Sequence, residues 1–437
     1  MKEKILKQVK DSKVKFIKLQ FTDILGVMKN INITADQLEK ALDNEIMFDG
    51  SSIDGFARIE ESDMFLYPDL ETFLILPTKL SGDVVEARII CDVYNANREP
   101  FNGDPRYILK KVVNEVASMG YEINVGPEME FFMFKLDEQG NPTLNPSDQA
   151  NYFDLSTTDK AHVVKREMCL ILQEMGFEVE AAHHENAPGQ HEIAFRYQSA
   201  LKSADNIMTF KATVKQVAEA HGLYATFMPK PVFGLAGSGM HMNQSLFKDG
   251  KNAFYDEKDA IGLSKEAYHY VAGILKHAKG TSLLTNSNIN SYKRLVSGYE
   301  APINICWATK NRSPLIRVPA SRGNGTRIEL RNPDPSCNPY LAFAGVIAAG
   351  LDGIKNELIP PTRIEGNTYE FTKEEAKDIE VLPENLKMAL NYMLRDELIK
   401  ETLGEHVVNC LTNATNEEWD NYRKIVTPYE TDKYIYL

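Results

Sequence analysis

The sequence contains few cysteines, and their arrangement does not indicate a disulfide framework. The 437 residues include five cysteines that lie far apart and form no C-x-x-C pair: Cys91, Cys169, Cys306, Cys337 and Cys410. An odd, dispersed set of thiols is typical of a reducing compartment. We therefore expect a cytoplasmic protein whose core is large enough to need no disulfides.

The chain also lacks a hydrophobic run that could cross a membrane. Its longest apolar stretch extends from Leu341 to Leu351, whereas a spanning helix needs about 20 apolar residues. The first ten residues, MKEKILKQVK, carry charges in every turn and do not form a signal-peptide core. The formal net charge of −13 argues against broad binding to polyanions. We expect neither a membrane nor a nucleic acid as partner.

Three common catalytic motifs are missing from the sequence. It has no G-x-x-x-x-G-K-[ST] loop, no G-x-G-x-x-G after a strand and no G-x-S-x-G nucleophile elbow. A nucleotide bound to this chain would therefore have to be held by metal ions and arginines.

The length predicts two or three domains, because the chain exceeds what one core usually serves. The best candidate boundary is NREPFNGDP at 97–105, which contains two prolines and a glycine. We place a small α+β domain at 1–103 and a large α+β domain, with an antiparallel sheet, at 104–437. The stretch 48–63 is rich in Gly, Ser and Asp, and we interpret it as an ordered loop. Expected helices cover 2–10, 34–44, 105–119, 158–175, 199–222 and 338–358, and expected strands cover 14–21, 72–76, 85–94, 121–135, 177–184 and 190–197.

Paired glutamates occur in the strand pattern at 121–135. Residues i and i+2 of a strand point to the same face, so Glu128 and Glu130 lie side by side. Like charges at this spacing are costly unless a cation or water screens them. Taken alone, the pair is also compatible with a solvated strand face.

A second polar constellation, HHENAPGQHE at 183–192, contains Glu185 and Glu192 near a Pro-Gly turn. Carboxylates from neighbouring strands can converge on hard divalent cations. The motif GSGMH places His241 after two glycines, where it could act as a metal ligand. A polar hairpin and a plain turn are the alternatives for these two segments.

Five arginines fall within a short region of this acidic chain, together with Glu329. Guanidinium groups bind carboxylates and phosphates through paired hydrogen bonds, so we expect an anionic ligand. A solvated salt-bridge ladder is the alternative. Together the glutamates, the histidine and the arginines favour metal-assisted phosphoryl transfer to a carboxylate, whose identity the residues alone leave open. The arginines are Arg294, Arg312, Arg317, Arg327 and Arg331.

At these motifs the sequence resembles type I glutamine synthetase, the bacterial and archaeal class, over nearly its whole length. The resemblance implies a small β-grasp domain, a catalytic domain with an open antiparallel sheet, and a dodecamer of two stacked hexamers with active sites between subunits. It also implies ATP-dependent condensation of glutamate with ammonia through γ-glutamyl phosphate, with two or three Mg²⁺ or Mn²⁺ ions in each site. The motifs are FDGSSIDGF (48–56), GPEMEFF (126–132), HHENAPGQHE, FMPKPVFG (227–234), GSGMH, NSYKRLVSGYEAP (290–302), RNPDPSCNPYLAFA (331–344) and the C-terminal W-x-x-Y.

The resemblance also implies a role for individual residues. The metal ligands near glutamate would be Glu130, Glu185 and Glu192, and those near the ATP phosphates would be Glu128, His241 and Glu329. Glutamate and its phosphorylated form would be held by Gly237, Arg294, Arg312 and Arg331, with Glu300 closing over them. ATP would contact Tyr197, Ser245, Arg317 and Arg327, and ammonium would meet Asp49 and Ser52 from a neighbouring subunit.

Regulation and specificity are less closely defined by the motifs. RIEESDM at 58–64 resembles the shorter, feedback-inhibited subclass, in which the position of Arg58 senses glutamine. The surroundings of Tyr369 do not resemble an adenylylation loop, and a regulatory protein is a further partner to consider. Ala236 and Asn243 depart from residues common in the family. The competing interpretations are a ligase that amidates another amine and a catalytically silent scaffold.

Overall fold

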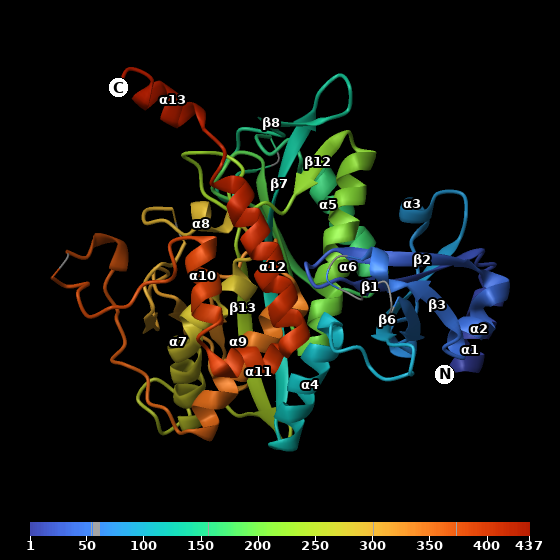
Figure 1. Ribbon diagram of the computed structural model, residues 1–437, viewed down its shortest axis with the longest axis horizontal. Coiled ribbons are helices and arrows are strands. Elements are labelled where there is room, and N and C mark those ends of the chain that lie inside the picture. The colour runs from blue at the N-terminus through green and yellow to red at the C-terminus, as the bar shows by residue number, and fades with distance from the viewer. Residues whose placement is uncertain (54, 56–61, 156, 300, 373) are drawn as a thin grey trace.

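Two β-sheets organise the chain, a small one near the N-terminus and a large one in the remainder (Figure 1). The computed structural model describes residues 1–53, 55, 62–155, 157–299, 301–372 and 374–437. Arg58 and Glu300, for which roles are predicted, lie outside the described residues.

The small sheet has six strands in the order β2-β1-β6-β4-β3, with β5 also paired to β6. Strand β1 alternates as predicted, and Ile17, Leu19 and Phe21 face the core. It runs parallel to β6 and antiparallel to β2, and helices α1 (Lys2–Asp11) and α2 (Leu38–Leu42) belong to the same unit. The strands are β1 (Phe16–Thr22), β2 (Met28–Thr34), β3 (Ile46–Asp49), β4 (Asp63–Pro68), β5 (Leu74–Ile75) and β6 (Glu86–Tyr94).

The prediction of a loop at 48–63 is wrong at both ends of that stretch. Strands β3 and β4 enter it from either side and pair antiparallel, with Phe48 opposite Met64. Their short sequences, IMFD and DMFLYP, are mostly apolar and do not alternate between polar and apolar residues. The partner strand therefore decides their conformation rather than local preference.

The large sheet has eleven strands and is antiparallel except between β15 and β16. Its path is β15-β16-β17-β13-β7-β10-β9, and the 15-residue strand β7 lies near its middle. The predicted antiparallel sheet is thus confirmed. The strands are β7 (Glu122–Leu136), β8 (Pro142–Pro146), β9 (Val179–His184), β10 (Gln190–Phe195), β11 (Gln198–Ser199), β12 (Leu223–Thr226), β13 (Met240–Lys248), β14 (Lys251–Asn252), β15 (Trp307–Ala308), β16 (Ile316–Arg317) and β17 (Ile328–Leu330).

Helices pack beside the large sheet, and α9 is the most buried of those described. Asn338 begins it by accepting a hydrogen bond from the backbone N–H of Tyr340, and Pro339 occupies the first helical position. Its apolar residues pack against α4, α6, α7 and α11, while α13 projects away from the body (Figure 1). The longer helices are α4 (Pro105–Ser118), α5 (His162–Glu174), α6 (Ala200–Ala220), α7 (Lys265–Thr285), α9 (Pro339–Lys355), α10 (Leu386–Met393), α11 (Glu397–Leu403), α12 (Glu405–Tyr422) and α13 (Pro428–Tyr434), and the shorter ones are α3 (Thr78–Ser81) and α8 (Ser291–Arg294).

A buried arginine ties the small sheet to the helices of the large unit. Arg106 in α4 binds Asp92 of β6 at 2.7 Å, Asp69 at 2.7 Å and Asp205 of α6 at 2.9 Å. Because a buried charge is tolerated only when it is paired, these three carboxylates fix the junction of the two units. The exact domain boundary between 103 and 104 stays a prediction.

All five cysteines are free thiols. Among the helices in the described part of the chain, none combines the length and the apolar character that a membrane crossing requires.

Candidate active site

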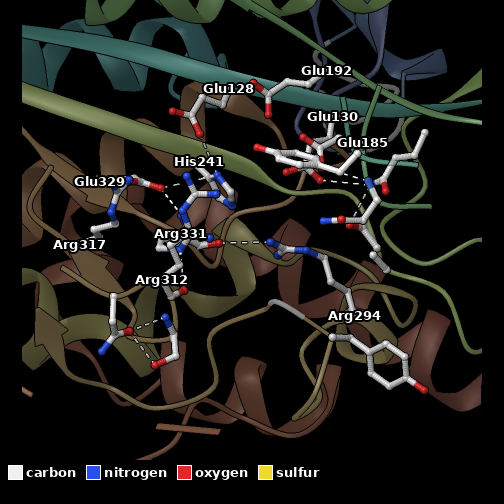
Figure 2. A pocket seen from close by; sticks show the side chains of 18 of the residues that line it. Glu128, Glu130, Glu185, Glu192, His241, Arg294, Arg312, Arg317, Glu329 and Arg331 are labelled. Carbon is white, nitrogen blue, oxygen red and sulfur yellow. Dashed lines mark hydrogen bonds and ion pairs between the residues drawn. The ribbon is translucent and has the colours of Figure 1, made fainter. Parts of the chain in front are cut away.

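Four neighbouring strands of the large sheet bring five of the six predicted metal ligands together, and the sixth, Glu185, directly follows β9 (Figure 2). Glu128 and Glu130 share one face of β7. In the antiparallel register, Glu192 of β10 lies opposite Glu130, and His241 of β13 lies opposite Glu128. Glu329 of β17 follows on the far side of β13. The two-residue period of a strand, combined with this register, gathers the side chains on one face.

The side chains line one cavity of about 550 Å³. It includes all six predicted metal ligands and five further predicted residues: Gly237, Arg294, Arg312, Arg317 and Arg331. Glu128, Glu130, Glu185 and Glu192 lie on one side of this cavity and the guanidinium groups on the other, with Glu329 among the arginines (Figure 2). The fold therefore joins a site for cations to a site for anions.

The first potential cation site consists of Glu128, His241 and Glu329. His241 Nδ1 lies 2.9 Å from Glu128 Oε2 and 3.7 Å from Glu329 Oε1. Burial, and then the charge of Arg331, lowers the pKa of His241 and keeps its imidazole neutral, the form that binds metal ions.

The second potential cation site is formed by Glu130, Glu185 and Glu192. His183 joins it, with Nε2 2.8 Å from Glu185 Oε1. The backbone N–H of Gly239 donates to Glu130 Oε2 at 2.9 Å.

Crowding of these carboxylates changes their acidity. Burial, followed by the charge of Glu185, raises the pKa of Glu130 to about 8. Burial, followed by the charge of Glu130, raises the pKa of Glu192 to about 9. Oxygen ligands in such a crowded, buried group fit a hard divalent cation, whose charge would offset the repulsion. The donor set therefore fits the metal ions that the sequence predicts.

The arginines at the other end are held in place by backbone and carboxylate oxygens. Arg294 is buried and donates to the carbonyl of Asn332 at 2.7 Å and to that of Arg331 at 3.2 Å. Arg317 Nη1 lies 2.7 Å from Glu329 Oε2, and Arg331 pairs with the other oxygen of Glu329. These contacts fix positive charge beside the carboxylates, where a phosphoryl group could be bound.

Two glycines let the chain pass close to this arginine layer. A Cβ at Gly237 would lie 2.4 Å from the carbonyl oxygen of Pro229, and one at Gly239 would lie 2.6 Å from Arg294 Nη2. The Pro229 carbonyl belongs to the backbone, so position 237 needs glycine, whereas a side chain at position 239 would have to displace the guanidinium group of Arg294. Ala236, a departure from the family pattern, also lines the cavity.

Three of the four predicted ATP contacts lie in an adjoining cavity of about 320 Å³, and the fourth, Arg317, lines the first cavity. Tyr197, Ser245 and Arg327 line the adjoining cavity, and Glu128 borders both cavities. Asp49 and Ser52 line neither cavity. Asp49 is exposed in the small unit, where it accepts hydrogen bonds from Ser51 and from the hydroxyl of Ser52 at 3.3 Å.

Sequence reasoning missed Gln190 as a supporting residue and named Asn243 only as a departure from the family pattern. The side-chain amide of Gln190 donates to Glu130 Oε2 at 3.2 Å and to the carbonyl of Gly237 at 3.0 Å. Asn243 donates to Glu128 Oε1 at 3.0 Å and accepts from Arg327 Nε at 3.0 Å. Both stand two residues from a metal-ligand position on the same strand face, so the alternation that found the glutamates could have found them as well.

Family models match almost the entire chain. The description "Glutamine synthetase, beta-Grasp domain" fits residues 13–96, and "Glutamine synthetase, catalytic domain" fits residues 102–434. This arrangement of cation and anion sites defines a metal-dependent enzyme that handles a phosphorylated substrate. The chain belongs to the glutamine synthetase family.

Named relatives and solved structures agree with this assignment. A glutamine synthetase of Clostridium saccharobutylicum is 57% identical over 436 residues, covering 99% of this chain and 98% of the relative. One of Staphylococcus aureus is 53% identical with the same coverage. A structure titled GmaS/ADP complex superposes with a TM-score of 0.90 at 31% identity, covering 99% of both chains. A cryo-EM structure of Plasmodium falciparum glutamine synthetase gives 0.90 at 27%, covering 99% of this chain and 98% of the other.

Binding of a divalent cation to the metal-free protein should release protons. Near neutral pH, Glu130 and Glu192 hold protons because their pKa values lie at about 8 and about 9. A cation needs both carboxylates ionised, so Mn²⁺ binding at neutral pH should release roughly one to two protons per site, and affinity should rise as the pH approaches 9. Calorimetry in buffers of different ionisation enthalpy measures this release. Affinity that stays constant across this range would contradict the expectation.

Proposed function

We propose that the chain forms L-glutamine from L-glutamate, ammonia and ATP in the cavity between β7, β10, β13 and β17, through a γ-glutamyl phosphate intermediate. The observation that carries the proposal is the meeting of crowded carboxylates and fixed guanidinium groups in one cavity. ATP-dependent glutamine formation is the activity of the family to which the chain belongs, and ATP and a divalent metal ion are part of it.

The two carboxylate groups would hold the cations, with Mg²⁺ or Mn²⁺ as the ions. Glu130, Glu185 and Glu192 form one ligand set, and Glu128, His241 and Glu329 form the other. Bound cations supply charge neutralisation for phosphoryl oxygens. His241 serves this purpose because it is neutral, and Gln190 and Asn243 orient the glutamates beside them.

The arginine end of the cavity would bind glutamate and the transferred phosphoryl group. Arg294 and Gly237 lie beside the carboxylate layer, where they bind the amino acid. Arg312, Arg317 and Arg331 then face the charge that develops on phosphoryl transfer. The phosphates and adenosine of ATP occupy the adjoining cavity along Arg327, Tyr197 and Ser245.

The ammonium site would be completed by a neighbouring subunit. Asp49 and Ser52 lie outside both cavities of their own chain, which supports their service to another one. There the Asp49 carboxylate accepts a proton from ammonium, and the resulting ammonia attacks the activated carbonyl. Glu300, outside the described residues, closes the site against water. The assembly that provides such contacts is a cytoplasmic dodecamer of two stacked hexamers.

Substrate omission tests the reaction. With Mg-ATP, phosphate release should require both glutamate and ammonium, because phosphoryl transfer needs the bound amino acid and turnover needs the amine. Phosphate and glutamine should be measured together. Release that depends on glutamate but is supported only by another amine would show a different ligase, and no turnover by a metal-loaded assembly would favour a scaffold.

Mixed assemblies test the shared site. Asp49→Asn and Glu192→Gln should each abolish most of the activity, since one removes the proton acceptor and the other a metal ligand. Random co-assembly in equal amounts should restore roughly a quarter of wild-type activity, because that fraction of interfaces pairs two intact halves. Doubly tagged assemblies purified in two steps establish the mixing. An absence of recovery in them would place both residues in the same chain's site.

Glutamine itself would regulate the enzyme through Arg58, without adenylylation of Tyr369. Tyr369 lines the cavity rather than an open loop, which supports the absence of adenylylation. Arg58→Ala should relieve inhibition by glutamine while leaving turnover at low glutamine within about twofold, since a sensor contact is removed and no ligand is lost. Inhibition by glutamine should be measured as a concentration curve for both proteins. Unchanged inhibition in Arg58→Ala would exclude Arg58 as the glutamine sensor. A regulatory protein remains a further expected partner.

A further inference from the structure

A buried polar cluster lies behind the metal-ligand wall, on the side of the β9–β10 hairpin away from the cavity. His184 and His191 are directly opposite each other in the register, and their ring centroids are 4.7 Å apart. Each immediately precedes a predicted metal ligand, Glu185 or Glu192. Both imidazoles are at most 1% exposed. Any shift of this pair would therefore be passed along the backbone to the two carboxylates.

Asp148 is the residue that both strands and the turn between them share. Its Oδ1 accepts from His184 Nε2 at 2.8 Å and from the backbone N–H of Gly189 at 3.1 Å. Its Oδ2 lies 3.7 Å from His191 Nε2, beyond hydrogen-bonding distance. One carboxylate thus binds the end of β9 and the turn, and it faces His191 at the start of β10.

The other nitrogens of the two histidines also have defined neighbours. His184 Nδ1 lies 2.7 Å from the carbonyl oxygen of Glu185, so this imidazole holds the backbone of a metal ligand directly. Lys165 Nζ lies 3.4 Å from His191 Nδ1 and 2.8 Å from Asp159 Oδ2. Because an ammonium group only donates, His191 Nδ1 accepts and the ring proton is on Nε2, facing Asp148.

These contacts distinguish between a metal site and a hydrogen-bond network. The ligand atoms of Asp148, His184 and His191 lie within 4.8 Å of one another, a spacing that a metal ion could also use. A cation there would have to displace the proton of His191 Nε2 and would lie close to the Lys165 ammonium group. The protein's own donors already face the Asp148 carboxylate, so the cluster is a hydrogen-bond network.

We propose that Asp148 is a positioning residue for the reaction: through His184 and Gly189 it fixes the hairpin that sets the separation of Glu185 and Glu192. The inference rests on the proposed metal role of these two glutamates. Repulsion between ionised carboxylates tends to open the hairpin, and the Asp148 network opposes that opening from behind. Polar groups that orient metal ligands from behind typically alter the metal affinity by about 10- to 100-fold.

Titration of the purified, metal-free assembly with Mn²⁺, followed by electron paramagnetic resonance, tests the inference. Asp148→Asn should weaken Mn²⁺ binding by about tenfold without changing the number of sites. The Mn²⁺ concentration for half-maximal activity should rise by the same factor, and kcat at saturating Mn²⁺ should return close to the wild-type value. Substitution of a purely structural residue would change the melting temperature without this change in Mn²⁺ affinity.

His277→Gln is the matched control. His277 is a buried imidazole in α7 that also binds two carboxylates, Asp396 at 2.7 Å and Asp352 at 3.1 Å. Its loss should lower the melting temperature and leave Mn²⁺ affinity unchanged. If Asp148→Asn does not yield folded protein, His184→Asn carries the test, with a weakening in the same direction, because His184 binds both Asp148 and the carbonyl of Glu185.

The remaining outcomes separate this inference from the proposed function. Wild-type Mn²⁺ affinity in a folded Asp148→Asn variant would overturn the inference, as would the loss of one Mn²⁺ per subunit, which would make the cluster itself a metal site. Glu192→Gln should weaken Mn²⁺ binding more strongly than Asp148→Asn does. Wild-type affinity in Glu192→Gln would instead refute the metal assignment.

Discussion

Repulsion among buried carboxylates is the constraint on which this site depends. Glu130 and Glu192 project from two adjacent strands into one cavity, where burial and then neighbouring carboxylates raise the cost of ionising them. An arrangement of this kind persists only if the backbone holds it and if protons or cations offset the charge. The eleven-stranded sheet supplies the first condition, and the chemistry of the ligands calls for the second.

The pairing of the strands in the large sheet holds the cavity-lining side chains in place, so few additional contacts are needed. Strand β7 is paired on both sides across the site, with β10 at Glu130 and β13 at Glu128. Its neighbours therefore cannot slip without moving every side chain to the other face. Polar contacts behind and beside the glutamates, from Gln190, Asn243 and the Asp148 network, then adjust their orientation.

Charge is divided within the molecule in a way that suits phosphoryl transfer. The chain is acidic overall, yet Arg317 and Arg331 both pair with Glu329, one on each carboxylate oxygen. Because both arginines pair with one carboxylate, their guanidinium groups stay beside the potential cation sites, where an anionic ligand could bind them. Arg106 performs a different task, since its three carboxylates hold the small unit against the large one.

The sequence by itself predicted the elements with strong periodicity and the residues proposed to carry the chemistry. Strand β7, helix α6 and helix α9 follow from alternation, amphipathic spacing and an apolar run, and the two glutamates of β7 follow from the same alternation. Only the tertiary structure decided that Gln190 supports Glu130, that β3 and β4 pair, and that Asp148 binds His184. The reason is physical: a local pattern fixes which face a side chain takes, whereas its partner depends on the register of strands far apart in the chain.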